Sequence, residues 1–295
     1  MRAIHVAPPW TAVLTDGQHT LVLFAVTAAA LALVATLVRV RFASGEVQGE
    51  YRTASLTANA VVAIALVAYV LVLASLIAGY HRTAAGWTPN EFTSFGWAFR
   101  YADWAITVPL LVVELLAVSI VFSPERRSRT RGAGMVLAFL MILLGFLGGF
   151  VVGDGRSFAA LLGFGLLSAA CFVALAALIV VDALHTLPRL PPQVRSPYRA
   201  AVLLLLTVWF VYPIVYGLQG TTSGGAWAVT SVIALSAADV IAKVGFGSLV
   251  HRTAVLRSRA DEDASPTTER RPRQPQADML WVGEQTRYER DAGRD

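Results

Sequence analysis

The sequence predicts an all-α membrane protein, a bundle of seven transmembrane helices, and three observations support this fold class. First, 56% of the 295 residues are hydrophobic and only 15% are charged, whereas about a quarter of a typical soluble domain is charged. Second, the apolar excess falls in long blocks, each near the roughly 20 residues that a helix needs to cross the hydrocarbon. Third, leucine and alanine dominate these blocks, and the alternating pattern of a barrel strand is absent.

The blocks divide the chain into three parts. Residues 1–19 are predicted to be an extracellular segment, and residues 20–254 form the helical domain. Residues 255–295 are predicted to be a disordered cytoplasmic tail, too polar and too short to be an enzymatic domain, so no enzyme is expected. The seven predicted spans cover residues 20–38, 56–80, 98–122, 132–152, 158–184, 200–218 and 227–250.

Arginine placement predicts the orientation. The connection 123–132 holds four arginines, and three more lie in the connection between the fifth and sixth spans. By the positive-inside rule the N-terminus is outside and the C-terminus cytoplasmic, in the cell membrane. This arginine excess accounts for most of the net charge of +5. The predicted partner is therefore an anionic lipid bilayer, and no nucleic acid is needed to explain the charge.

Lys243 is the only lysine in the chain, and it lies inside the seventh predicted span, four residues after Asp239. Residues four apart share a helix face, so a structural ion pair is one interpretation. That interpretation does not explain why lysine appears only here, among 24 basic residues. A buried lysine is also a nucleophile that forms imines with carbonyl compounds, which arginine cannot do.

The third predicted span carries Arg100, Asp103, Thr107 and Glu114. Asp103 and Glu114 are eleven residues apart, which is about three helical turns, so both acids point the same way. Charged groups inside a membrane are costly and usually functional. A line of titratable groups across the bilayer indicates a proton relay, while two separately satisfied carboxyl groups are the alternative.

Three motifs together resemble the microbial rhodopsin family, and within it the outward proton pumps of the proteorhodopsin and xanthorhodopsin type. They are RYADWAITVPLLVVEL at 100–115, WFVYPIVY at 209–216 and DVIAKVGFG at 239–247. The resemblance covers all seven spans in order. It implies a bundle that encloses a retinal pocket, and no metal site. It also implies a homo-oligomer, a trimer or a pentamer.

The resemblance also implies roles for the charged residues. Lys243 would carry all-trans retinal as a protonated Schiff base, with Asp103 as primary counterion and proton acceptor. Asp239 would be the second counterion. Glu114 would return a proton from the cytoplasmic side. Thr107 would hydrogen-bond Asp103, and Arg100 would stabilise the two aspartates and gate the outer half-channel.

The family pattern further predicts the pocket. Tyr69 would bond the second counterion, and Tyr216 stands where many relatives have tryptophan. Gly163 aligns with a small residue that opens a carotenoid-antenna window in xanthorhodopsin. We interpret it instead as a close-packing glycine, because Leu-Leu follows where the family has Ser-Thr. The remaining predicted pocket residues are Trp104, Leu111, Met141, Gly145, Trp209, Tyr212 and Pro213.

The triplet Asp103, Thr107 and Glu114 is typical of outward proton pumps in this family. Two departures stand out. Ala68 occupies the place of a histidine that bonds the acceptor carboxylate in proteorhodopsin-like pumps. The outer segment 217–231 contains no acid, which predicts that the proton is released late in the cycle.

Two other classes of function remain open. A sensory rhodopsin would use the same pocket and signal through a partner protein, although Glu114 favours fast turnover over a long-lived signal. A seven-helix transporter or scaffold without retinal would leave the single lysine unexplained. Membranes that stay colourless with all-trans retinal would support this last class.

Overall fold

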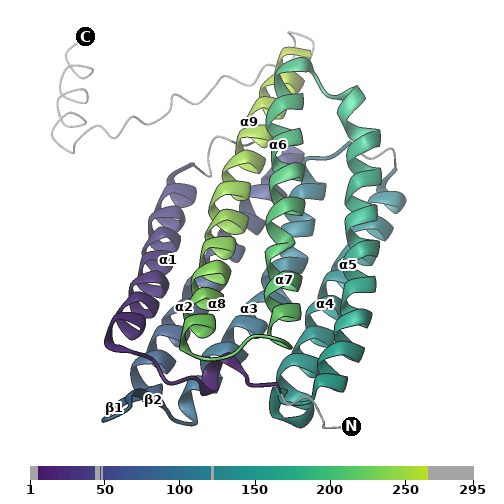
Figure 1. The fold of residues 1–295 in the computed structure, drawn as a ribbon. Coiled ribbons are helices and arrows are strands. Elements are labelled where there is room, and N and C mark those ends of the chain that lie inside the picture. The colour runs from purple at the N-terminus through teal and green to yellow at the C-terminus, as the bar shows by residue number, and fades with distance from the viewer. Residues whose placement is uncertain (1–5, 44–46, 48, 121–122, 265–295) are drawn as a thin grey trace, which may run out of the picture. The chain divides into compact units, whose positions relative to one another are not determined.

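The computed structural model describes residues 6–43, 47, 49–120 and 123–264. Long helices lie side by side, and α1 contacts both α2 and α8, so the bundle closes on itself (Figure 1). The helices are α1 (Asp16–Ala43), α2 (Arg52–Gly79), α3 (Phe92–Ala117), α4 (Pro124–Phe146), α5 (Phe158–Thr186), α6 (Pro192–Trp209), α7 (Val211–Leu218), α8 (Gly225–Val240) and α9 (Phe246–Ala264).

Local sequence signals explain where several helices begin and end. Ser123 caps α4 by accepting a hydrogen bond from the Arg126 amide, and Pro124 follows at the first helical position. Ser157 caps α5 in the same way, through the Ala160 amide. The sixth predicted span is divided into α6 and α7, which meet at Phe210.

Short elements complete the described chain. The strands β1 (Tyr80–Thr83) and β2 (Gly86–Pro89) form an antiparallel hairpin, which the all-α prediction did not include. Leu14 pairs with Trp87 of this hairpin, so the N-terminal segment lies against it. Single helical turns make up the rest. They are Pro9–Thr11, Gly49–Tyr51, Leu147–Val151, Val152–Gly155, Leu187–Arg189 and Ile241–Gly245.

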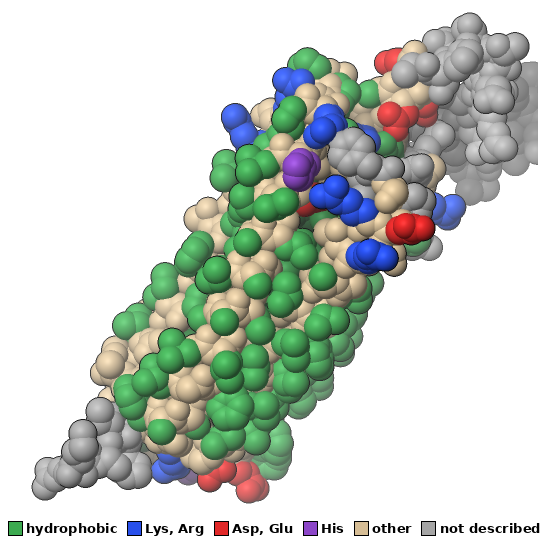
Figure 2. Space-filling view, turned by 90° about the vertical axis from the view of Figure 1, so that its right-hand side faces the viewer, with side chains coloured by type: hydrophobic (Ala, Val, Ile, Leu, Met, Phe, Trp, Pro, Cys, Tyr) green, Lys and Arg blue, Asp and Glu red, His purple; other side chains and the backbone are tan. Residues whose placement is uncertain are grey.

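Six helices in the described ranges are long and apolar enough to cross a membrane. The third helix, α3, is not among them. It is 26 residues long, but Arg100, Asp103 and Glu114 make it less apolar. Large hydrophobic side chains such as Phe24 and Leu184 are exposed on the outside of the bundle. Figure 2 shows hydrophobic side chains covering the middle of one face, with charged side chains gathered towards its ends.

The interior of the bundle holds the charged residues that the sequence singled out. Arg100, Asp103, Glu114, Asp239 and Lys243 are each at most 3% exposed. The bundle is therefore apolar on its outer surface and polar at its centre, which suits a helical protein in lipid.

The chain divides into a compact unit that ends at Ser258 and a second unit that begins at Arg259. Helix α9 continues to Ala264, into the segment that was predicted to be a disordered tail. The rest of the predicted tail, residues 265–295, and the end of the third predicted span, residues 121–122, lie outside the described residues.

Candidate functional site

Lys243 lies in the π-helical turn Ile241–Gly245, between α8 and α9. Its side chain is only 1% exposed, and Nζ lies 2.5 Å from Asp103 Oδ2. Nζ also lies 3.3 Å from Asp239 Oδ1, one turn earlier on the same span. The fold thus places the single lysine between one carboxylate from the third span and one from the seventh.

Asp239 accepts hydrogen bonds from three uncharged donors on three other helices. Tyr69 Oη of α2 donates to Oδ2 at 2.8 Å, as the family pattern predicted. Trp104 Nε1 of α3 and Tyr212 Oη of α7 each donate to Oδ1 at 2.9 Å. The sequence analysis predicted these two residues as part of the retinal pocket and did not predict these hydrogen bonds. Asp239 therefore connects the seventh span to three others.

Arg100 is the second buried cation of the site. Its Nη1 lies 3.6 Å from Asp239 Oδ2 and donates to Tyr69 Oη at 3.2 Å, while Nη2 donates to Ser236 Oγ at 3.0 Å. With Lys243 and Asp103, the cluster formally holds two positive and two negative charges. Such balance is needed, because unpaired charges at this depth are strongly disfavoured.

Asp103 has fewer partners than Asp239. Lys243 contacts its Oδ2, but its buried Oδ1 has no hydrogen-bond donor among the described residues. Thr107 hydrogen-bonds Asp103, as the family pattern predicted, with Thr107 Oγ1 donating to the main-chain carbonyl of Asp103 at 2.9 Å. Hydrogen bonds to a carboxylate favour its charged form. Asp103 accepts fewer hydrogen bonds than Asp239 does.

Glu114 lies further along α3 and is 1% exposed. Its Oε1 is buried, and no donor to it occurs in the ranges that the structure describes. A Cβ atom at Gly247 would lie 3.5 Å from this oxygen. Gly247 follows Lys243 by four residues, so Glu114 faces the seventh span about one helical turn beyond the lysine.

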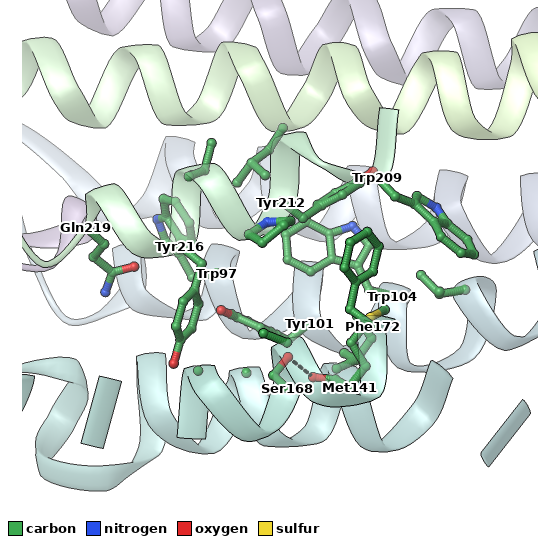
Figure 3. Close-up of a pocket in the computed structure, with 18 residues that line it drawn as sticks. Trp97, Tyr101, Trp104, Met141, Ser168, Phe172, Trp209, Tyr212, Tyr216 and Gln219 are labelled. Carbon is green, nitrogen blue, oxygen red and sulfur yellow. Dashed lines mark hydrogen bonds between the residues drawn. The ribbon is translucent and has the colours of Figure 1, made fainter. Parts of the chain in front are cut away.

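A cavity lies beside this charged cluster, lined mainly by aromatic and small side chains from α3 to α8 (Figure 3). Tyr216 and Gln219 lie at one end of the view, and Trp209 and Phe172 at the other. The predicted pocket residues that line it are Trp104, Met141, Gly145, Trp209, Tyr212, Pro213 and Tyr216.

Other residues that line the cavity were not predicted from the sequence. On α5, Gly165, Ser168, Ala169 and Phe172 line the cavity. Their spacing of three and four residues marks one face of a helix, a signal that could have found them. From α3, Trp97 and Tyr101 also line it, whereas Leu111 is buried but is not among the lining residues.

Gly163 does not have the place that we predicted. It is exposed, and nothing in the described structure lies within 4 Å of a Cβ atom built there. The close-packing interpretation is therefore wrong for Gly163. Gly165 is the closely packed glycine instead, because its Cβ atom would lie 2.7 Å from Tyr216 Cε1.

A closed helical bundle with one buried lysine between two aspartates, beside an aromatic cavity, defines a retinal-protein type of site. The comparisons place the chain accordingly. The family model described as Bacteriorhodopsin-like protein matches residues 17–256. The chain therefore belongs to the bacteriorhodopsin-like family of microbial rhodopsins, whose members bind retinal and are light-driven pumps or sensors, not enzymes.

Proteins similar to this chain include both pumps and a sensory rhodopsin. Archaerhodopsin-3 of Halorubrum sodomense is 30% identical over 162 residues, 55% of this chain and 57% of its own length. Sensory rhodopsin-2 of Natronomonas pharaonis is 31% identical over 202 residues, 68% of this chain and 75% of its own. The solved structure of xanthorhodopsin, titled a light-driven ion pump with dual chromophore, is 29% identical with a TM-score of 0.73. That match covers 84% of this chain and 97% of xanthorhodopsin.

The residues present fit a retinal group. The cavity is apolar and aromatic, as sites for elongated hydrophobic ligands usually are. Trp104 and Tyr212 both line the cavity and hydrogen-bond Asp239, so the cavity borders the carboxylate that contacts Lys243. Lys243 is not itself among the lining residues, but its amine contacts the carboxylate to which two of them donate.

Proposed function

We propose that the protein is a light-driven outward proton pump, in which Lys243 carries all-trans retinal as a protonated Schiff base. Bound retinal would supply the light-driven change in geometry that makes the Lys243 nitrogen release its proton. The observation that carries this proposal is the 2.5 Å contact between Lys243 Nζ and Asp103 Oδ2. This contact places a nitrogen that carries a proton beside the carboxylate that has the fewer hydrogen-bond donors.

In the outward half of the cycle, Asp103 takes the proton from the Lys243 nitrogen. Asp239 stays charged, because Tyr69, Tyr212 and Trp104 donate to it. Arg100 lies three residues before Asp103, on the side of the predicted outer surface. When Asp103 becomes neutral, Arg100 loses a nearby negative charge and is freer to move outward, which opens the way for release.

In the return half, Glu114 gives its proton to the Lys243 nitrogen. This buried carboxyl group, whose Oε1 has no hydrogen-bond donor among the described residues, fits a proton donor, because apolar surroundings favour the neutral acid until a base needs the proton. Gly247 leaves the seventh span without a side chain beside Glu114. Glu114 therefore lies against the backbone of the seventh span, about one helical turn from Lys243.

The direction of pumping rests on the predicted orientation. Arg257 Nη1 of α9 donates to the carbonyls of Val118 and Ser119, at the end of α3. The ends of the third and seventh spans therefore meet next to the arginine-rich start of α4. The positive-inside rule makes this end cytoplasmic, and Glu114 lies nearer to it than Asp103 does. A cell-membrane location and a trimer or pentamer complete the proposal.

A sensory rhodopsin is the second candidate function. It is favoured by the match to sensory rhodopsin-2, which covers more of this chain than the match to archaerhodopsin-3 does. Both functions use the same lysine and the same cavity. They differ in turnover, since a sensor needs a long-lived state and a pump needs a fast return of the proton.

The first test is the light-induced pH change of an unbuffered suspension of cells that make the protein with retinal. A pump acidifies the medium in the light, and a protonophore abolishes the change. Lys243→Arg is the matched control, because it keeps the positive charge and cannot form an imine. Coloured membranes without any pH change would reject the pump and favour the sensor.

A further inference from the structure

Asp182 of α5 is a carboxylic acid that the proposed cycle leaves without a role. It is partly buried and lies near the arginine-rich end of the bundle, four residues before the end of α5. Tyr198 Oη of α6 donates to Asp182 Oδ2 over a long 3.4 Å. The Ser119 side chain, just beyond α3, also interacts with this carboxylate.

Ser119, Asp182, Thr186 and Tyr198 form what we call the entry cluster. Thr186 Oγ1 accepts a hydrogen bond from the Ile120 amide and also interacts with the Tyr198 hydroxyl. Ser119, Thr186 and Tyr198 are at most 3% exposed. The cluster is thus a buried polar group in which three spans meet, with Asp182 as its partly exposed member.

Charged groups surround this cluster. His185 on α5 and Arg126 on α4 are close enough to influence the charge of Asp182, and Arg257 on α9 influences Tyr198. Asp182 itself is partly exposed, so its carboxyl group can exchange protons with water at this end of the bundle.

The cluster also lies close to Glu114 along the chain. Ser119 follows Glu114 by five residues and lies two residues beyond the last residue of α3. Exposure falls along this line, from partly exposed Asp182 to Ser119 at 3% and Glu114 at 1%. The cluster thus joins a partly exposed carboxylic acid to a buried hydroxyl that lies five residues beyond the proposed proton donor.

We propose that Asp182 is the proton-entry residue that recharges Glu114 after each turnover. The carboxylate takes a proton from a cytoplasmic hydronium ion and leaves water. It then passes a proton towards the Glu114 carboxylate, with the Ser119 hydroxyl as an intermediate carrier. No electron transfer or further reactant is involved. The inference rests on the proposed function, because it needs Glu114 to lose and regain a proton.

The test follows the infrared carbonyl band of Glu114 after a light flash in the full-length protein reconstituted with retinal. Glu114→Gln assigns the band by removing it. In Asp182→Asn we expect Glu114 to regain its proton on the order of tenfold more slowly, because a positioned proton carrier is lost. We also expect the rate to become dependent on added buffer. In the same variant, Glu114 should still release its proton at the wild-type rate.

Three further variants separate this role from a structural one. Asp182→Glu restores an acid and should restore the rate, whereas a purely structural contact need not tolerate the longer side chain. Asp182→Leu needs no hydrogen-bond partner and should reproduce the slow uptake if Asp182→Asn fails to fold. Glu125→Gln removes an exposed acid at the same end of the bundle and should change nothing.

Two results would overturn the inference, and they differ. If Glu114 cycles in the wild type and Asp182→Asn regains the proton at the wild-type rate without added buffer, Asp182 is not the entry residue and the pump stands. If the Glu114 band never changes in the wild type, the proposed proton donor fails together with its entry route.

Discussion

Two aspartates contact the same lysine, yet the rest of their surroundings differ. Asp239 is held by three uncharged donors and by Arg100, whereas one oxygen of Asp103 has no described donor. At the scale of single residues, this contrast separates two roles for the same chemical group. In the proposed pump, Asp239 is the carboxylate that stays charged, and Asp103 is the one that accepts the proton.

The first prediction concerns the stability of this cluster. Asp239→Asn leaves Arg100 without its carboxylate and should cost about 3–5 kcal/mol, as removing one partner of a buried ion pair does. Asp103→Asn removes fewer interactions and should lower the thermal bleaching midpoint less. The measurement is loss of visible colour on heating the retinal-bound proteins. Equal midpoints for the two variants would mean that the extra hydrogen bonds of Asp239 do not matter.

The second prediction concerns Glu114. In Glu114→Gln the Lys243 nitrogen must regain its proton from bulk water, so we expect reprotonation to slow by about 100-fold at neutral pH. Its rate should then fall about tenfold for each unit by which the pH rises, because the reaction becomes first order in protons. Flash photolysis across a range of pH checks both effects. A rate that is independent of pH would show that another internal donor exists.

At the scale of elements, Tyr216 packs closely against glycines of helix α5 and of the turn after α4. Cβ atoms at Gly148, Gly149 and Gly165 would each come within 2.7 Å of the Tyr216 side chain. Tyr216 Oη also donates to the Leu161 carbonyl of α5 at 3.0 Å. Glycine is needed at these positions because the tyrosine ring fills the space that a larger side chain would occupy.

The third prediction compares two glycines on the same helix. Gly165→Ala should force Tyr216 aside, destabilise the protein by about 1–3 kcal/mol as overpacking does, and shift the absorption maximum. Gly163→Ala meets open space and should be neutral or stabilise the helix by up to about 1 kcal/mol. Thermal bleaching and the visible spectrum of the two variants test this. A spectral shift in Gly163→Ala alone would contradict the assignment.

The same elements show how far sequence can lead. The positions of the spans could be predicted from the length of the apolar blocks. Lys243, Asp103 and Asp239 could be singled out because charged residues are costly in lipid and therefore rare inside a span. The hairpin Tyr80–Pro89 was missed because ten residues with mixed polarity carry no clear alternation. The hydrogen bonds of Trp104 and Tyr212 to Asp239 were missed because they depend on how neighbouring helices are rotated, which sequence periodicity alone does not determine.

At the scale of the whole molecule, the end of the bundle opposite the arginine-rich one has acids such as Asp16, Glu91 and Asp154, but none of them lines the cavity. The cavity reaches Gln219, whose Nε2 donates to the Gly149 carbonyl at 3.3 Å, and none of the residues that line it is a carboxylic acid. In the proposed pump, the cavity lining therefore offers no acid that could release another proton to the medium.

The fourth prediction follows from the lack of acids in the cavity lining. Release should come late in the cycle, when Asp103 itself gives up its proton, so uptake should precede release near neutral pH. A water-soluble pH dye, followed with vesicles after a single flash, shows the order. Alkalinisation before acidification is expected. The opposite order would reveal an outer release group that the cavity lining does not contain.

The short distance between Lys243 and Asp103 also bears on the electrical work of the proposed pump. A charge that crosses the membrane against 100 mV requires about 2.3 kcal/mol, spread over a hydrocarbon thickness of roughly 30 Å. The first transfer spans only 2.5 Å, which is less than a tenth of that thickness. Membrane voltage should therefore hardly slow the light-triggered step. It should act on the later movements through Glu114 and past Arg100, where nearly all of the photocurrent would arise.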